Sequence, residues 1–280
     1  TTHIRPLGRV ATPLAQGDYS PRAQVMGGDE ISELAESFNR MADAVEKNIQ
    51  ELEEAARRQE DFTASFVHEL KTPLTSIIGY ADMLRSGNLG EDMRFKAASY
   101  IFSEGKRLEN LSLALMSLLV VGHSTADARP VNMRRLCQEA GRICQPAMRA
   151  KGLTLSVRAE EGVLRGDAAL LQTLLQNLLD NARKATDSGG QVVLAGRKDK
   201  EGYRITVADQ GRGIPEGELN KITEPFYMVD KSRSRAEGGA GLGLALCKEI
   251  VELHRGQLCF ESREGKGTIV TAGLGGVADA

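Results

Sequence analysis

The chain has 280 residues, of which 41% are hydrophobic and 26% are charged. This length and composition predict two or three folded domains with hydrophobic cores. The formal net charge is -2, there is no tryptophan, and aromatic residues make up 4% of the chain. Proteins that bind nucleic acids usually carry a basic excess and aromatic side chains for base stacking, so we expect no nucleic-acid partner.

Neither the cysteines nor the apolar runs indicate a metal centre or a membrane span. The four cysteines form no C-x-x-C pair, which favours reduced thiols over zinc or disulfides. The longest apolar run, Leu111–Gly122, is too short to cross a membrane and contains serine. The chain opens on Thr1 with no methionine and no signal peptide, so we expect it to be a fragment of a longer protein.

Residues 1–50 predict a short helix, a connector rich in glycine and proline, and a second helix. Asp29 and Glu30 open the second helix, where acidic residues suit the positive end of the helix dipole. Its apolar residues recur in steps of three and four, the spacing of a coiled-coil seam. The seam comprises Ile31, Leu34, Phe38, Met41, Val45, Leu52 and Ala55.

The apolar seam continues through Phe62 and Phe66, after which its phase shifts by one residue. A second helix is expected from about Glu91, after a turn at Ser86–Asn88. One hairpin cannot cover both of its apolar stripes, so we expect two chains to pair as a four-helix bundle. The shifted seam comprises Val67, Leu70, Leu74, Ile77, Ala81 and Leu84, and the second helix carries Ala98, Ile101, Gly105, Leu108, Leu115 and Leu119.

His68 is the first candidate for chemistry. If the shifted seam faces the core, His68, Glu69 and Thr72 lie together on the solvent face. An exposed neutral imidazole can attack phosphorus, and an adjacent carboxylate can take its proton. Pro73 lies inside this helix, where it removes a hydrogen bond and costs about 3 kcal/mol, so we expect a functional reason for it. If His68 were considered without the rest of the sequence, an ordinary surface histidine with no catalytic role would be the better interpretation.

The segment 122–130 predicts a hinge, and the sequence beyond it alternates between helix and strand patterns. This alternation predicts an α/β fold. The expected helices are Met133–Met148, Leu170–Lys184 and Gly241–Leu253, and the expected strands are Leu153–Val157, Val192–Ala195, Tyr203–Val207, Leu258–Glu261 and Thr268–Leu274.

The helix expected over Leu170–Lys184 carries polar residues that suit a metal ion and phosphates. Asn177 and Asn181 lie one helical step apart on one face. Two neutral oxygen ligands suit Mg²⁺, which keeps waters and phosphate oxygens for its other positions. Lys184 can reach phosphate oxygens, whereas Asp180 lies on a different face and is a weaker candidate. The alternative is a set of ordinary polar residues on a helix surface.

Asp209 directly follows an expected strand and offers an acceptor for the amino group of adenine. Gly211 and Gly213 would let the base approach the backbone closely. Farther on, Gly238–Leu244 would close over phosphates, and the next helix would aim its first N–H groups at them. This spacing is neither a P-loop nor a dinucleotide fingerprint, and a flexible loop is the alternative. The polar stretch that contains Lys231, Arg233 and Arg235 predicts a lid over the nucleotide.

Together these segments resemble one protein family. Phe66–Leu74 is similar, nearly position for position, to the phospho-acceptor box of sensor histidine kinases. The four segments that recur in the ATP-binding domain of that family follow in the same order. They are Asn177–Lys184, Asp209–Gly213, Glu224–Tyr227 and Gly238–Leu244.

The resemblance implies a multidomain fold. An α-helical HAMP linker is expected over 1–50 and a dimerisation and histidine phosphotransfer domain over 51–125, whose dimer forms a four-helix-bundle stem. An α/β sandwich ATP-binding domain of the type shared with type II topoisomerases and heat-shock ATPases is expected over 126–275. The linker is the least specific part, since proline, glycine and coiled-coil stripes are common.

The resemblance also implies roles for individual residues. His68 would accept the phosphoryl group from ATP, Glu69 would be the general base, and Thr72 would orient water in a phosphatase reaction. Asn177 and Asn181 would hold Mg²⁺. The nucleotide would be bound by Asn177, Asn181, Lys184, Asp209, Gly211, Gly213, Phe226, Gly239, Gly241, Leu242 and Gly243.

The resemblance implies a homodimer that passes the phosphoryl group to an aspartate on the receiver domain of a response regulator. The chain would be the cytoplasmic portion of an inner- or plasma-membrane protein, anchored by an N-terminal transmembrane segment outside this sequence. Ala185 and Ala240 depart from the family, where many relatives carry tyrosine and threonine, and both departures put the strength of nucleotide binding in doubt. Two alternatives stay open: a non-catalytic scaffold that binds ATP, and a conformational ATPase of the chaperone or topoisomerase class.

Overall fold

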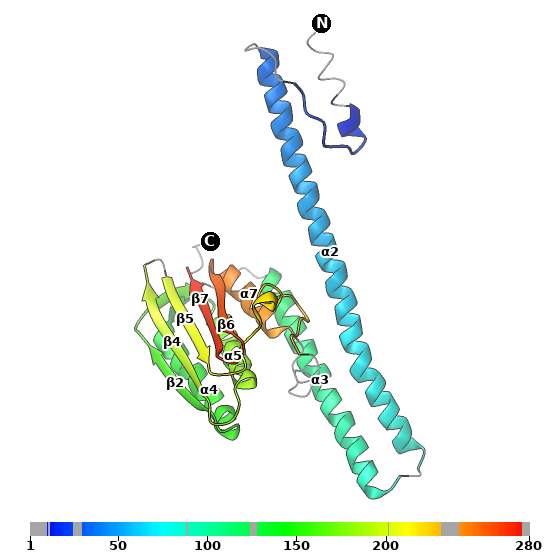
Figure 1. The fold of residues 1–280 in the computed structure, drawn as a ribbon, viewed down its shortest axis with the longest axis vertical. Coiled ribbons are helices and arrows are strands. Elements are labelled where there is room, and N and C mark those ends of the chain that lie inside the picture. The colour runs from blue at the N-terminus through cyan, green and yellow to red at the C-terminus, as the bar shows by residue number, and fades with distance from the viewer. Residues whose placement is uncertain are drawn as a thin grey trace. The chain divides into compact units, whose positions relative to one another are not determined.

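The computed structural model describes residues 10, 12–24, 30–87, 89–123, 128–200, 202–230 and 241–275. It divides into two compact units, Thr1–Ser65 and Phe66–Ala280. One long helix, α2 (Glu30–Arg85), runs through both (Figure 1). The division falls beside the position at which the apolar seam changes phase. Among the described residues, no helix combines the length and the hydropathy needed to cross a membrane.

In the first unit, residues 12–15 are helical and a connector returns along α2. Arg22 contacts Asp43 and Glu46 of α2 at 2.7 and 2.6 Å, and the backbone of Ala23 forms two hydrogen bonds with the side chain of Asn39. Arg22 thus bridges two carboxylates on successive turns of the helix. These contacts fasten the connector to one face of α2.

The face of this helix that is buried within a single chain differs from the predicted coiled-coil seam. The buried positions are Ser32, Ala35 and Ala42, whereas Leu34 and Met41 are at least half exposed. Small side chains on this face let the connector approach the helix backbone closely. The large apolar side chains one residue away therefore face solvent in the single chain.

In the second unit, the C-terminal part of α2 and α3 (Glu91–His123) form the predicted helical hairpin. Tyr80 stacks on Tyr100 across the two helices, with ring centroids 4.8 Å apart. The helix continues through Pro73 without interruption. The start of α3 at Glu91 and the end of α2 before Ser86 agree with the sequence prediction.

The faces of this hairpin also differ from the predicted seam. Glu69, Pro73 and Ala97 are buried, while Val67 and Leu74 are 56% and 51% exposed. One helix of a hairpin covers only one side of its neighbour, and here α3 lies against the Glu69 side of α2. A second apolar stripe that includes Val67 and Leu74 remains uncovered within one chain.

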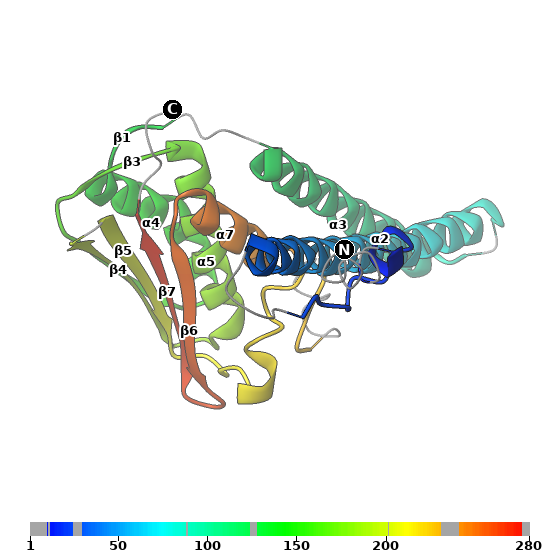
Figure 2. The same ribbon diagram turned by 90° about the horizontal axis from the view of Figure 1, so that it is seen from above.

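The α/β lobe contains a five-stranded sheet in the order β2-β4-β5-β7-β6, in which only β2 and β4 are parallel. Three helices pack side by side on one face of the sheet (Figure 2). The strands are β2 (Thr154–Ala159), β4 (Gln191–Asp199), β5 (Gly202–Asp209), β6 (Gln257–Arg263) and β7 (Gly267–Leu274), and the helices are α4 (Met133–Ala150), α5 (Ala168–Ala185) and α7 (Gly243–Leu253).

The sequence prediction identified each of these elements but missed a separate two-stranded sheet. Its strands are β1 (Arg129–Asn132) and β3 (Val163–Gly166), which pair antiparallel. The predicted hinge therefore ends too late, since Arg129 and Pro130 already belong to β1. Both strands have four residues, too few to display an alternating pattern that a reader of the sequence can recognise.

Helix α5 is the central buried element of the lobe. Asp167 caps its first turn by accepting hydrogen bonds from the N–H groups of Ala169 and Leu170 at 2.8 and 3.1 Å. Each leucine that it buries contributes about 1.5–3 kcal/mol relative to an exposed position. The opposite face is left for the polar residues of the candidate site. The buried side chains are Leu171, Leu174, Leu175, Leu178, Leu179 and Ala182.

His254 joins the end of α7 to the start of α5. The residue is fully buried. Its Nε2 accepts a hydrogen bond from the N–H of Asp167 at 3.1 Å, and its Nδ1 lies 2.7 Å from the carbonyl oxygen of Ile250. Because a peptide N–H can only donate, Nε2 is the acceptor and Nδ1 carries the hydrogen.

Replacing His254 with leucine is expected to lower the free energy of unfolding by about 1–3 kcal/mol, because the N–H of Asp167 loses its buried acceptor. Urea denaturation followed by circular dichroism measures this loss. Glutamine can place an oxygen near the position of Nε2, so His254→Gln should retain more stability than His254→Leu. Equal losses in the two variants would show that packing, not the hydrogen bond, is what matters.

Candidate active site

The histidine of the predicted phospho-acceptor box lies on the surface of α2. The side chain of His68 is 73% exposed, which confirms the predicted accessibility of this imidazole. Its Nδ1 lies 3.9 Å from Oε1 of Glu69. The hydroxyl of Thr72 donates a hydrogen bond to the carbonyl oxygen of His68 at 3.2 Å. The three residues are therefore neighbours on successive turns.

Glu69 is not on the solvent face, and that prediction was wrong. Only 7% of its side chain is exposed, and its Oε2 lies 2.6 Å from Nη2 of Arg107 on α3. The apolar repeat of α2 indicates the exposed face only of an isolated helix. The crossing of α3 over this part of α2 turns the position of Glu69 into an interior one.

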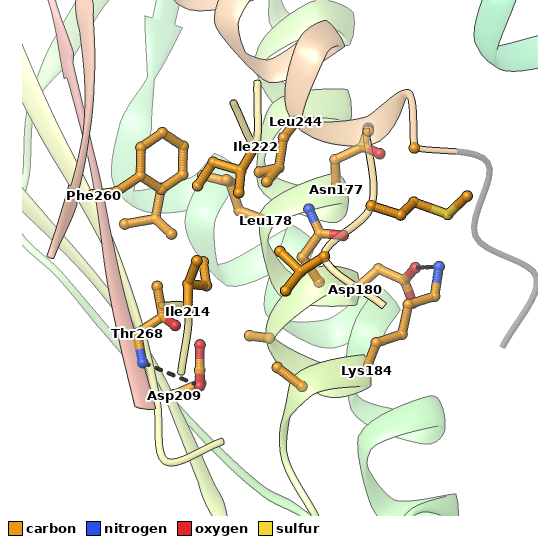
Figure 3. A pocket seen from close by; sticks show the side chains of 18 of the residues that line it. Asn177, Leu178, Asp180, Lys184, Asp209, Ile214, Ile222, Leu244, Phe260 and Thr268 are labelled. Atoms are coloured by element: carbon orange, nitrogen blue, oxygen red, sulfur yellow. Dashed lines mark hydrogen bonds and ion pairs between the residues drawn. The ribbon is translucent and has the colours of Figure 1, made fainter. Parts of the chain in front are cut away.

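A cavity of about 610 Å³ lies in the α/β lobe and is closed on one side by Asn110 and Ala114 of α3. Figure 3 shows side chains from α5, β5, β6, β7 and the start of α7 directed into it. Eight of the eleven residues predicted to bind the nucleotide line this cavity, although they are spread over 67 positions of the sequence. They are Asn177, Asn181, Lys184, Asp209, Gly213, Gly241, Leu242 and Gly243.

Asn177 and Asn181 meet the requirements of a magnesium site that is completed by phosphates. The Nδ2 of Asn177 donates to the carbonyl of Thr173 at 2.9 Å, so its Oδ1 is the atom left to face the start of α7. The Nδ2 of Asn181 is buried without a hydrogen-bond partner among the described residues. Turning that amide over would place its oxygen there instead. Both amides fit a hard cation with oxygen ligands.

No group of three or more His, Cys, Asp or Glu side chains in the described part of the chain could hold a metal ion alone. Mg²⁺ usually takes few protein ligands and completes its shell with waters and phosphate oxygens. A metal at Asn177 and Asn181 would thus be held jointly by the protein and a nucleotide.

Asp180 lines the cavity, contrary to the prediction that it lies on a different face. Its carboxylate contacts Lys184 at 2.8 Å and Arg183 at 2.7 Å (Figure 3 shows the lysine contact). Burial alone would raise the pKa of Asp180, but the two cations outweigh it and the pKa is lowered. Lys184 is therefore held over the cavity by a neighbouring charge before any phosphate arrives.

Asp209 lies at the end of β5, where the sheet register places it opposite Thr268 of β7. Its Oδ1 accepts hydrogen bonds from the N–H groups of Gly211 at 2.8 Å and Thr268 at 3.3 Å. The second carboxylate oxygen points into the cavity (Figure 3). Burial raises the pKa of Asp209, and the two backbone donors act against this rise without cancelling it.

Two glycines of the site are required by its geometry. Gly213 has φ of +70°, and a Cβ there would lie 2.1 Å from the carbonyl oxygen of Arg263. A Cβ on Gly243 would lie 3.0 Å from Oδ1 of Asn177. A side chain at either position would displace backbone or a candidate metal ligand. Both glycines are thus required by packing within the protein, and their predicted role in the approach of a nucleotide stays a prediction.

Of the other three predicted nucleotide-binding residues, Gly211 and Phe226 are described and are not part of the cavity lining. The N–H of Gly211 donates a hydrogen bond to Oδ1 of Asp209, the carboxylate oxygen that does not point into the cavity. Phe226 is buried next to the lining residue Gly241, whose carbonyl accepts a hydrogen bond from the N–H of Phe226 at 2.8 Å, and its ring centroid lies 6.3 Å from that of Phe66. Its role toward the nucleotide stays a prediction. Gly239 lies outside the described residues, as do Ala240 and the basic residues of the predicted lid.

The sequence prediction missed the apolar walls of the cavity. They suit the faces of a flat base, since ligand sites are lined mainly by apolar side chains. No sequence pattern indicated these walls, because their side chains come from separate segments of the chain. The Ile-Pro after Gly213 was the nearest available hint. The apolar lining includes Leu178, Val207, Ile214, Ile222, Phe260 and Val270.

Three known protein families match successive parts of this chain. Residues 166–275 match the family described as histidine kinase-, DNA gyrase B-, and HSP90-like ATPase. Residues 58–117 match the His Kinase A (phospho-acceptor) domain, and residues 2–47 match the HAMP domain. The three matches follow one another in the order predicted from the motifs. The chain belongs to the sensor histidine kinase family of two-component systems.

Curated relatives of this histidine kinase include signal transduction histidine-protein kinase BaeS of Escherichia coli, which is 33% identical over 265 residues. That match covers 93% of this chain and 55% of BaeS. Sensor histidine kinase MtrB of Mycobacterium tuberculosis is 33% identical over 270 residues, 94% of this chain and 47% of MtrB. The chain thus spans about half the length of the curated relatives that it matches.

Solved structures share the fold of this histidine kinase. Histidine kinase ThkA, solved in complex with response regulator protein TrrA, matches with a TM-score of 0.64 and 23% identity, covering 80% of this chain and 65% of ThkA. Full-length ShkA in complex with AMPPNP matches with a TM-score of 0.57 and 24% identity, covering 79% of this chain and 47% of ShkA. The predicted fold, a helical HAMP and stem region followed by an α/β ATP-binding domain, is confirmed.

Proposed function

We propose that this chain transfers the γ-phosphoryl group of ATP to His68 and then to an aspartate on the receiver domain of a response regulator. The observation that carries the proposal is an exposed imidazole beside a carboxylate in the same chain as a cavity lined by Asn177, Asn181 and Asp209. A conformational ATPase would need the cavity but not the histidine box. The complex of ThkA with response regulator TrrA supports the second transfer.

The proposed autophosphorylation uses His68 as nucleophile and Glu69 as base. The Nδ1 of His68 donates its hydrogen toward Glu69, which leaves the Nε2 lone pair to attack the γ-phosphorus. An N–P bond forms as the bond from phosphorus to the bridging oxygen breaks, and its electron pair leaves with ADP. The positive charge that develops on the imidazole is relieved as the Nδ1 proton shifts to the carboxylate of Glu69.

The proposed nucleotide complex places adenine at Asp209 and the phosphates near α5 and the start of α7. The free oxygen of Asp209 accepts a hydrogen bond from the amino group of adenine, between apolar walls that exclude water. Asn177 and Asn181 would hold Mg²⁺, which would neutralise charge on the phosphates. Lys184 is close enough to exchange its contact with Asp180 for a phosphate oxygen.

We propose that two chains pair through the stem as a homodimer, with domain limits near 1–50, 51–125 and 126–275. The uncovered stripe that includes Val67 and Leu74 of α2, with Phe102 and Leu113 of α3, supports pairing, since one hairpin leaves these side chains exposed. The HAMP match supports attachment to a membrane segment before residue 1.

A phosphatase activity toward the phosphorylated regulator is part of the proposal. It assigns Thr72 the role of orienting water for attack on phosphoaspartate. The hydroxyl of Thr72 donates to the carbonyl of His68, so its lone pairs remain to accept from water. Its place one turn from His68 puts it where a docked receiver domain would present its aspartate.

Incubating the chain with γ-labelled ATP and Mg²⁺ tests the proposed function. Label on the protein that is lost in acid and kept in alkali is expected, because phosphohistidine hydrolyses in acid. A chelator that removes Mg²⁺ should abolish the labelling. Adding a receiver domain should move the label to that protein. Steady hydrolysis of ATP with no labelled protein would contradict the proposal and favour a conformational ATPase.

A further inference from the structure

We infer that Arg107 of α3 is a positioning residue that holds Glu69 in place for the reaction at His68. The inference rests on the proposed function and adds to it a residue outside both the histidine box and the ATP cavity. It follows from the ion pair between α2 and α3. That pair determines where the carboxylate beside the imidazole can point.

Glu69 and Arg107 form one of the least exposed ion pairs of the described chain. Their side chains are 7% and 10% exposed, and Oε2 of Glu69 lies 2.6 Å from Nη2 of Arg107. Exposed ion pairs contribute about 0–1 kcal/mol to folding stability. Removing one partner of a buried pair costs more, because it leaves the other charge buried and unpaired. The guanidinium therefore has a large effect on where the Glu69 carboxylate lies.

The two oxygens of Glu69 have different neighbours. Oε2 contacts Arg107, while Oε1 lies 3.9 Å from Nδ1 of His68. A hydrogen bond between nitrogen and oxygen needs about 2.7–3.2 Å, so a movement of about 1 Å by the exposed imidazole closes the gap. The anchored carboxylate can stay where it is while His68 moves. Arg107 thus fixes one oxygen and leaves the other directed at the histidine.

Glu104 holds the guanidinium on its own helix. Its Oε2 lies 3.6 Å from Nη1 of Arg107, one turn away on α3. Arg107 is thus contacted by a carboxylate from each helix of the hairpin. Only the contact from Glu69 connects it to the reacting imidazole. This difference makes Glu104→Gln an informative comparison, since it disturbs Arg107 without removing the anchor of Glu69.

The consequence concerns the rate of phosphoryl transfer and not the binding of ATP. Without the guanidinium, the Glu69 carboxylate would turn toward water and leave the imidazole without its proton acceptor. A misplacement of about 1 Å in a catalytic group can cost up to about 100-fold in rate. The proposed ATP cavity is lined on its α3 side by Asn110 and Ala114, and its lining does not include Arg107 or Glu69.

The test measures autophosphorylation of the whole chain at varied ATP concentration. Arg107→Met is expected to lower kcat by about tenfold or more and to leave the KM for ATP within about twofold. Arg107→Lys, which keeps the charge, should recover most of the rate. Lys106→Met removes a positive charge from the same turn but from an exposed side chain, so its kcat should stay within about twofold.

A double variant decides whether Arg107 acts through Glu69. In a Glu69→Gln background, adding Arg107→Met should lower kcat by less than about twofold, since the carboxylate it positions is already gone. A full tenfold loss in that background would overturn the inference, and so would an Arg107→Met variant with normal kcat. If Arg107→Met loses helix content, Arg107→Gln, which removes the charge but keeps a polar side chain, takes its place in both comparisons. A parent chain that makes no phosphohistidine would instead defeat the proposed function, and this inference with it.

Discussion

Replacing His68 with glutamine is expected to abolish acid-labile labelling of the protein by ATP completely. Glutamine keeps the size and polarity of the side chain and the helix propensity of the position but has no nucleophilic nitrogen. Because the side chain is 73% exposed, the substitution should not change the stability of α2 measurably. Loss of labelling then reports the missing nucleophile and not a damaged fold.

Two controls belong with the His68 variant. Lys71→Gln changes another exposed side chain on the same helical turn and should keep labelling within about twofold of the parent chain. The His68→Gln variant should bind a fluorescent ATP analogue as the parent does, because His68 does not line the cavity. Label that survives the substitution would assign the phospho-acceptor to another residue.

The chemistry of the two sites could be predicted from the sequence largely because it depends on local order. The exposure of His68 was predicted correctly, although the same repeat assigned Glu69 to the wrong face. The spacing of Asn177, Asn181 and Lys184 is a property of one helix. Asp209 was found because it ends a strand and precedes a glycine. Each of these inferences needs only the geometry of a single element.

Predictions that depend on how elements cross failed. Glu69 was assigned to solvent because the repeat of α2 cannot show that α3 brings Arg107 to that side. Asp180 was assigned to another face of α5, although the cavity is wide enough to include it. Phe226 was predicted from its motif to bind the nucleotide, and no sequence pattern showed that its ring would be buried near that of Phe66. Tertiary packing determined all three outcomes.

The apolar stripes show the same limit at the level of whole helices. The repeat predicted Leu34 and Val67 as core residues, yet both are more than half exposed in one chain. An apolar seam indicates that something covers it but not which molecule does so. The short strands β1 and β3 were missed for a different reason, since four residues carry too little pattern to be recognised.

Replacing Asp209 with asparagine is expected to weaken ATP binding by about 30- to 100-fold. One oxygen of Asp209 is held by the N–H groups of Gly211 and Thr268. An asparagine must keep its only oxygen there, so its NH₂ group would face the cavity. Two donors, the side-chain NH₂ and the adenine amino group, would then oppose each other. The loss of a charged hydrogen bond, about 2–3 kcal/mol, corresponds to that change in affinity.

Isothermal titration with ATP and GTP measures the effect of this substitution. A control variant, Asp199→Asn, changes a carboxylate that does not line the cavity and should bind ATP as the parent does. Guanine carries an acceptor oxygen where adenine carries its amino group. The Asp209→Asn variant should therefore lose its preference for ATP over GTP as well as its affinity. An unchanged affinity for ATP would mean that the base does not bind at Asp209. If the base did bind there, replacing the accepting carboxylate oxygen with an amide N–H donor would lower the affinity.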